Sequence, residues 1–150
     1  DASATDALPT LTGSALLNTD GPVTGFVTLR WTALDRETVV PLDTRNAASY
    51  FLPFDNLAGY TTAIALANLS PQPASVVVNL RDSSGTLLES STLSLPARGQ
   101  LSYLLPARHT AITGRRGTAE FITPSGGRIA VLGLRVKPDG TLSAIPVLVP

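Results

Sequence analysis

The chain contains no cysteine and no methionine among its 150 residues. The absence of cysteine excludes a disulfide scaffold, a cysteine-ligated zinc site and a thiol enzyme. Charged residues make up 15% of the chain, against about 25% in an average soluble domain. Because 11 basic and 11 acidic residues cancel, the charge also argues against a general nucleic-acid binder. No apolar run approaches the roughly 18 residues that a membrane span requires.

The residues that are present predict an all-β protein. A chain of this length buries roughly 70% of its unfolded surface, so one domain can fold without disulfides, metals or cofactors. Short β-branched runs alternate with glycine, proline, asparagine and aspartate, and no segment has a helical apolar period. This pattern predicts an Ig-like antiparallel β-sandwich of about eight to ten strands.

Two segments give the clearest strand predictions. In the run 76–81, Val76, Val78 and Leu80 fall on one face, and a turn with Gly85 at positive φ follows. The returning strand loses its alternation near residues 89–91, which predicts a bulge or a switch to the other sheet. The run 60–67 is apolar on both faces, with alanines on one of them, and therefore predicts a central strand. Pro53 places its own strand at a sheet edge or bulge, because proline cannot donate to a ladder.

Residues 13–42 resemble residues 117–147, which indicates an approximate internal repeat. Gly13–Leu17 aligns with Gly117–Phe121, and Leu29-Arg30 aligns with Leu134-Arg135. The arginine-to-proline spacing is identical, since 41 − 30 and 146 − 135 both equal 11. Each copy predicts a hairpin, a loop and a strand ending at the proline. The predicted inward residues are Val27, Leu29 and Trp31 in the first copy and Leu132, Leu134 and Val136 in the second.

Several stretches carry a resemblance to a known family. They are residues 51–56, 59–68, 114–121, 129–135 and 145–148. Over residues 13–149 the chain resembles an Ig-like β-sandwich module found in secreted proteins of Acidobacteria and related bacteria. The resemblance implies an extracellular β-sandwich of uncertain function and carries no catalytic residues.

The first residues suggest an arm ahead of the domain. Residues 1–12 are small and polar, as at the start of a mature secreted chain or at a boundary chosen for expression. We therefore expect an extended arm over residues 1–12, a single β-sandwich over residues 13–150, and a secreted, extracellular or cell-surface location. The arm could complete the sheet edge of a neighbouring copy by strand addition, or residues 8–17 could form the first strand of their own domain. The candidate assembly residues are Ala7, Leu8, Leu11, Leu16 and Leu17.

No catalytic or metal site emerges from the sequence. His109 is the only histidine, lies in a loop-like stretch and is expected at the surface. No Gly-x-Ser-x-Gly nucleophile motif and no calcium-loop pattern is present. Asp55 and Asn56 predict a turn in which their side chains bond to backbone groups. We expect a protein that is not an enzyme and has no catalytic, cofactor or metal residues.

Two residues are candidates for glycan chemistry. Tyr60 is the best exposed aromatic platform for stacking against a sugar, because the pattern assigns Trp31 to the core. Asn68 begins an Asn-Leu-Ser glycosylation motif, although Pro71 follows it. The leading functional prediction is a non-catalytic extracellular structural or interaction protein that assembles with itself into a filament or surface layer. The alternative is a carbohydrate-binding or adhesion module.

Zero net charge conceals an uneven distribution. Residues 1–60 contain three basic and seven acidic residues, which gives 3 − 7 = −4. Residues 61–150 contain eight basic and four acidic residues, which gives 8 − 4 = +4. The halves either interleave in one sandwich, where their charges pair, or form opposite surfaces that meet between subunits.

Overall fold

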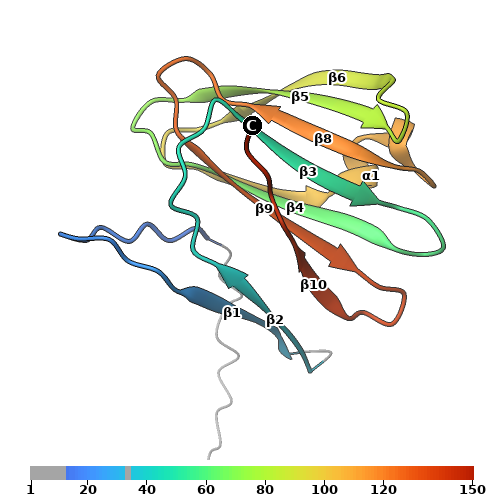
Figure 1. Ribbon diagram of the computed structural model, residues 1–150, viewed down its shortest axis with the longest axis horizontal. Coiled ribbons are helices and arrows are strands. Elements are labelled where there is room, and N and C mark those ends of the chain that lie inside the picture. The colour runs from blue at the N-terminus through green and yellow to red at the C-terminus, as the bar shows by residue number, and fades with distance from the viewer. Residues whose placement is uncertain (1–12, 33–34) are drawn as a thin grey trace, which may run out of the picture.

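The computed structural model describes residues 13–32 and 35–150, with the Trp31 side chain left out. Ten strands and two short helical turns follow one another in this part of the chain (Figure 1). The strands are β1 Phe26–Trp31, β2 Arg36–Pro41, β3 Ser49–Asp55, β4 Thr61–Asn68, β5 Ala74–Asp82, β6 Leu87–Leu95, β7 Gln100–Leu104, β8 Arg116–Ile122, β9 Ile129–Val136 and β10 Leu142–Ile145. The helical turns are α1 Leu105–Arg108 and η2 Thr110–Ile112.

Two four-stranded antiparallel sheets form the sandwich. Their strand orders are β3-β8-β5-β6 and β10-β9-β4-β7. The buried faces alternate along the strands as predicted: Val76, Val78 and Leu80 of β5 and Ile64 and Leu66 of β4 are at most 2% exposed. The prediction of an all-β sandwich with about ten strands is therefore confirmed.

The order of strands resembles an immunoglobulin sandwich in its centre and differs at its margins. If β4, β5, β7 and β8 take the places of immunoglobulin strands B, C, E and F, the B–E and C–F pairs are both present. In contrast, β3 pairs with β8 and β9 pairs with β4, so β3 and β9 lie in the opposite sheets from immunoglobulin strands A and G. Every ladder remains antiparallel.

An edge proline, a turn glycine and one bulge are the local features that the sequence also predicted. Pro53 lies in β3, an edge strand of its sheet, where its missing N–H costs nothing. Gly85 has φ of 88° in the turn between β5 and β6. The register of these strands shifts so that Leu80 faces Glu89 and Arg81 faces Leu87. The bulge therefore falls at Leu88, one residue before the predicted stretch.

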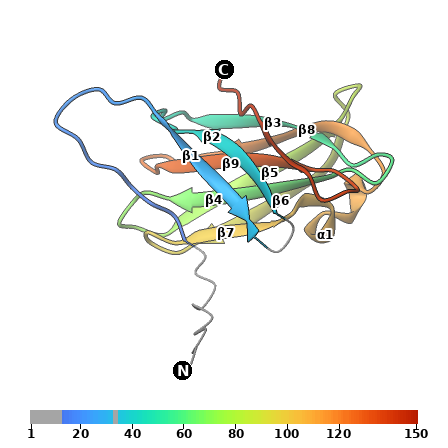
Figure 2. The ribbon, with the colours of Figure 1, turned by 90° about the horizontal axis from the view of Figure 1, so that it is seen from below.

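The strands β1 and β2 form a separate two-stranded sheet. This hairpin lies beside the sheet β10-β9-β4-β7, with β2 packed against β10, and makes a third layer (Figure 2). An isolated hairpin is marginally stable in water, so its order depends on what it packs against. The remaining described chain before it, residues 13–25, is exposed throughout and contains no strand.

The predicted hairpin of each copy is wrong, because β8 and β9 lie in different sheets and Gly13–Leu17 is not a strand. The two copies share a later hairpin instead: β1–β2 corresponds in sequence to β9–β10, where β2 ends at Pro41 and β10 ends at Ile145, one residue before Pro146. Gly117–Phe121 lies in β8, but its counterpart Gly13–Leu17 is not a strand. The two copies therefore begin differently.

The predicted inward face of β9 is wrong. Ile129, Val131 and Gly133 face the core, whereas Leu132, Leu134 and Val136 lie on the outer face. The reason is Gly133, which adds no apolar signal to the sequence but is buried against Leu52. A Cβ built on it would lie 2.2 Å from Leu52 Cδ1. In β1, Leu29 is half-buried, Val27 is 48% exposed, and the Trp31 side chain lies outside the described residues.

Candidate functional site

The two outer faces of the sandwich differ in chemistry. The outer face of β8-β5-β6 is polar, and there Asn79 donates a hydrogen bond to Glu120 and accepts one from Ser90. The outer face of the other sheet is apolar along its two central strands. Its residues there, all only partly buried, include Ala63, Ala65, Ala67, Ala130, Leu132 and Leu134. Because the hairpin layer lies on this side, the apolar face and the exposed residues of the hairpin belong to one region of the molecule.

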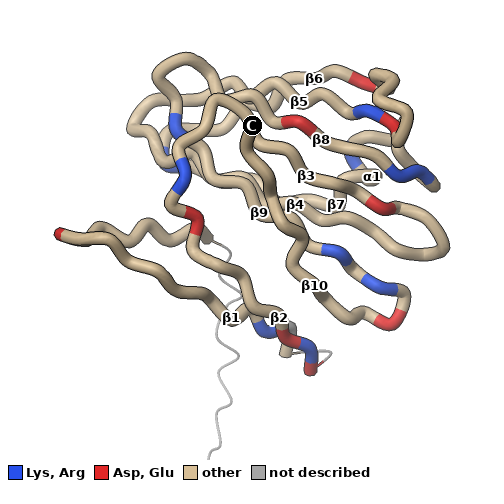
Figure 3. Tube along the Cα trace, in the orientation of Figure 1, with Lys and Arg blue, Asp and Glu red and all other residues tan. Residues whose placement is uncertain are grey.

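Exposed apolar side chains concentrate in and before the hairpin. Six of the ten large hydrophobic residues that the described chain leaves exposed lie between residues 16 and 39. We call this set the N-terminal apolar surface: Leu16, Leu17, Val23, Phe26, Val27 and Val39, which are 39–68% exposed. Phe26 and Val39 share the outer face of the hairpin, and Val27 lies on its other face. Figure 3 shows charges at the tip of the hairpin, whereas residues 13–29 contain a single charged residue, Asp20. Large exposed apolar patches on folded domains are typical of interaction sites, so this set is the candidate surface.

A groove lies where the chain leaves the hairpin. It has a volume of about 360 Å³ and is lined by Val40–Arg45, by Val131 and Leu132 of β9, and by Ala144–Val147. Its ionic groups are already paired. Arg45 donates to Asp43 over 2.8 Å and also to the Val147 carbonyl. The rest of the lining is mostly apolar, so the groove suits an extended apolar segment better than a charged small molecule.

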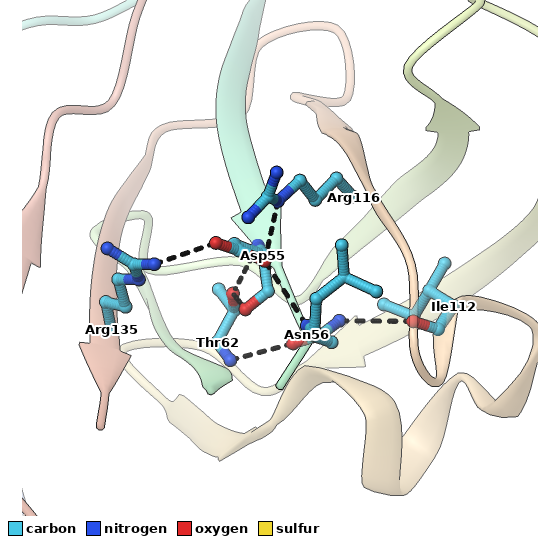
Figure 4. A network of polar contacts seen from close by, with 7 residues as sticks. Asp55, Asn56, Thr62, Ile112, Arg116 and Arg135 are labelled. Carbon is cyan, nitrogen blue, oxygen red and sulfur yellow. Dashed lines mark hydrogen bonds and ion pairs between the residues drawn. The ribbon is translucent and has the colours of Figure 1, made fainter. Parts of the chain in front are cut away.

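At the opposite end of β9, Asp55 joins three elements (Figure 4). Its carboxylate accepts hydrogen bonds from Arg116 Nε at 3.0 Å and from Arg135 Nη2 at 2.8 Å. Burial raises the pKa of Asp55, but the Arg116 hydrogen bond, the Leu57 N–H and the charges of both arginines outweigh it and hold the pKa below its usual value. These ion pairs connect the acidic first half with the basic second half, so part of the uneven charge pairs internally.

The turn after Asp55 matches its prediction. The Asp55 carboxylate accepts the Leu57 N–H, and the Asn56 amide oxygen accepts the Thr62 N–H at 2.9 Å. On its other side, the Asn56 amide donates to the Ile112 carbonyl at 3.3 Å. This network is a structural junction between β3, β4 and η2.

Tyr60, the predicted glycan platform, lies beside this junction. The Arg135 guanidinium carbon is 3.9 Å from the centre of its ring, a cation–π contact. A sugar stacking on that ring face would have to displace Arg135. Glycan binding at Tyr60 stays a prediction.

No protein-family model, no curated protein and no solved structure matches this chain. The resemblance to the acidobacterial module stays a prediction, as do the extracellular location and the function that it implies. What the chain does therefore has to be argued from its own surface.

His109 is buried, contrary to the predicted surface position, and is only 1% exposed. Its Nδ1 lies 2.5 Å from Glu89 Oε1 on β6, and its Nε2 lies 3.2 Å from the Tyr103 hydroxyl on β7. Burial raises the pKa of Tyr103 to about 12, against the opposing charge of Arg108. Sequence reasoning missed this cluster because its three members come from separate elements. The His109 ring is inaccessible, and the cluster links the edge strands β6 and β7 of the two sheets.

Asn68 is also buried, at 2% exposure. Its Nδ2 donates to the carbonyls of Gln72, Leu95 and Pro96, at 2.8, 3.4 and 2.9 Å. A glycan is attached at this nitrogen, so glycosylation would require these contacts to break. The side chain therefore has a structural role at the end of β4, and an attached glycan stays a prediction.

The remaining predicted residues divide between described and undescribed parts of the chain. Ala7, Leu8 and Leu11 lie outside the described residues. Leu16 and Leu17 are described and are 44% and 62% exposed. Over residues 13–32 and 35–150, no three His, Asp or Glu side chains group as metal ligands, and no helix is long and apolar enough to cross a membrane.

Proposed function

We propose that this protein is a non-catalytic, extracellular structural or interaction subunit that associates with copies of itself. The observation that carries the proposal is the N-terminal apolar surface. It is the main concentration of exposed large hydrophobic residues in the described chain, and it belongs to a layer outside the sandwich. Burial of such a surface drives association, at roughly 25 cal/mol per Å² of apolar area removed from water.

Self-association also gives a partner to the outer face of the hairpin, since its inner face alone packs on the sandwich, through β2 and β10. Two strands without a third normally need a packing surface, and here Phe26 and Val39 of the hairpin remain 68% and 51% exposed. A neighbouring copy that covers these side chains would supply that packing. The assembly that we propose is a filament or a surface layer.

The test is the size of the purified full chain over a concentration series, by light scattering and electron microscopy. We expect assemblies for the unmodified chain and monomers for the triple variant Leu17→Asp, Phe26→Asp, Val39→Asp. The matched control is Leu87→Asp, since Leu87 is 47% exposed on β6, away from this surface, and should leave assembly unchanged. A chain that stays monomeric at its highest soluble concentration refutes the proposal. If it stays monomeric and binds glycans in a Tyr60-dependent way, the alternative prediction of a carbohydrate-binding module takes its place.

A further inference from the structure

The strand β9 has a free edge over half its length. On one side it pairs with β4 from Ile129 to Val136, but on the other β10 covers only Gly133–Val136. Continuing the same register would put Pro146 opposite Leu132. Proline has no N–H to extend the ladder, and the chain turns away instead, so that Leu148 exchanges backbone hydrogen bonds with Phe51 of the other sheet. The stretch Ile129–Leu132 therefore has no second strand among the described residues.

The groove described above lies along this edge. Val131 and Leu132 are part of its lining, and the chain from Val40 to Arg45 forms the facing wall. Alternate residues of an edge strand direct both N–H and C=O outward, where they can pair with an added strand. Backbone pairing on one side and an apolar wall on the other are the features of a strand-addition site.

The same chain contains a segment suited to this site. Residues 13–24 are exposed throughout, and no backbone hydrogen bond joins them to another described residue. Within them, Gly13–Leu17 matches in sequence Gly117–Phe121, which does form a strand, β8. A segment with a strand-like sequence that pairs with no strand of its own fold is a candidate for pairing with a strand of another molecule.

We infer that the free edge of β9 at Ile129–Leu132 accepts an extended apolar strand from a second copy of this chain, supplied by residues 13–24. The donor begins next to the groove in its own copy, since the Gly25 carbonyl accepts the Leu42 N–H. From there the described chain first runs outward and then turns back before it reaches residue 13 (Figure 2). The donor backbone pairs with β9, Leu17 enters the apolar part of the neighbour's groove, and Leu16 points to the opposite side of the added strand. This inference rests on the proposed self-association and adds which two segments meet, residues 13–24 of one copy and the edge of β9 in the other.

The absence of cysteine allows a direct test by crosslinking. A full chain with Leu17→Cys is mixed with a full chain with Leu132→Cys and treated with a short bismaleimide. The matched control pairs Leu17→Cys with Leu87→Cys, which also offers a partly exposed leucine position. We expect the crosslinked heterodimer of the first pair to exceed that of the control by at least about tenfold, because a seated donor strand raises the effective concentration of one cysteine around the other.

A second measurement separates this inference from the proposed function. Leu16→Asp with Leu17→Asp should weaken assembly at least about tenfold and leave the far-ultraviolet circular dichroism of the sandwich unchanged. If the protein assembles but the two crosslinking pairs give equal yields, the β9 edge is not the acceptor and only the inference fails. If no assembly forms at all, the proposed function fails too. A crosslink that forms within one chain carrying both cysteines, in place of one between copies, also overturns the inference.

Discussion

Gly133 of β9 packs directly against Leu52 of the other sheet, and this contact gives a prediction about stability. A Cβ at this position would lie 2.2 Å from Leu52 Cδ1, whereas real Cβ contacts stay beyond 3.0 Å. One of the two groups must therefore move by at least 3.0 − 2.2 = 0.8 Å. Leu52 is fully buried on β3, so it has little space into which to move.

We expect Gly133→Ala to destabilise the protein by about 1–3 kcal/mol, the usual cost of one extra methyl group in a packed core. In a domain of this size each kcal/mol lowers the melting temperature by about 2–4 °C. Leu52→Ala alone should cost about 2–5 kcal/mol because it leaves a cavity. In the double variant the new methyl group occupies part of that cavity, so the combined loss should be smaller than the sum by about 0.5–3 kcal/mol.

Gly117 provides the matched control. A Cβ there would meet the Arg81 carbonyl oxygen at an impossible distance and would also lie 2.8 Å from Phe54 Cζ. Because the main obstacle is backbone, Phe54→Ala should not rescue Gly117→Ala. Urea unfolding followed by far-ultraviolet circular dichroism gives all these free energies, provided that the slopes with urea agree among the variants. Strict additivity of Gly133→Ala and Leu52→Ala would refute the reasoning.

Three further predictions concern buried polar groups. The pKa of Tyr103 is raised from 10.0 to about 12, so between these pH values the folded state keeps a proton that the unfolded state loses. The free energy of unfolding should therefore fall as the pH rises from 10 to 12. In unfolding experiments across this range, Tyr103→Phe should remove that fall. The pKa of Asp55 is held below 3.8, so its stabilising contribution is complete above that pH and is lost below it; Asp55→Asn should flatten the acid limb of the stability curve, measured by thermal melts at decreasing pH. Asn68→Ala should lower the free energy of unfolding in urea by about 1–3 kcal/mol, because it leaves buried backbone carbonyls without a donor. The control Ser94→Ala should change stability little, since the Ser94 side chain on β6 is exposed.

The sequence was sufficient for features whose signal is local. Alternation in β4 and β5 predicted their buried faces, Pro53 predicted an edge strand, and Gly85 predicted a turn. Each of these depends on neighbours within a few residues, so periodicity and backbone preferences determine it. The inward face of β9 was predicted wrongly for a related reason. Gly133 lies on the buried face but adds no hydrophobicity to it, whereas Leu132 and Leu134 on either side make the outer face look more apolar in the sequence.

Features that depend on distant partners could not be predicted. His109 meets Glu89 across 20 residues, and Asp55 meets Arg116 and Arg135 across 61 and 80 residues. A single sequence gives no information on which distant charges become neighbours. The hairpin shows the same limit in another form, since alternation identified Leu29 as facing inward but not the surface against which it packs.

The positions of donor and acceptor also constrain the symmetry of an assembly. Residues 13–24 and the edge of β9 are different surfaces of one chain, so a copy that donates to one neighbour can still accept from another. Such a contact is heterologous, and it propagates into an open filament unless the rotation between copies closes a ring. Reciprocal exchange between two copies would instead give a closed dimer. The two outcomes differ when a chain with a disabled donor (Leu16→Asp, Leu17→Asp) is added to the unmodified chain. In an open filament such a chain accepts a strand but donates none, so substoichiometric amounts terminate growth and shorten the polymers. In a closed dimer they only reduce the yield of dimers, and the largest species keeps its size.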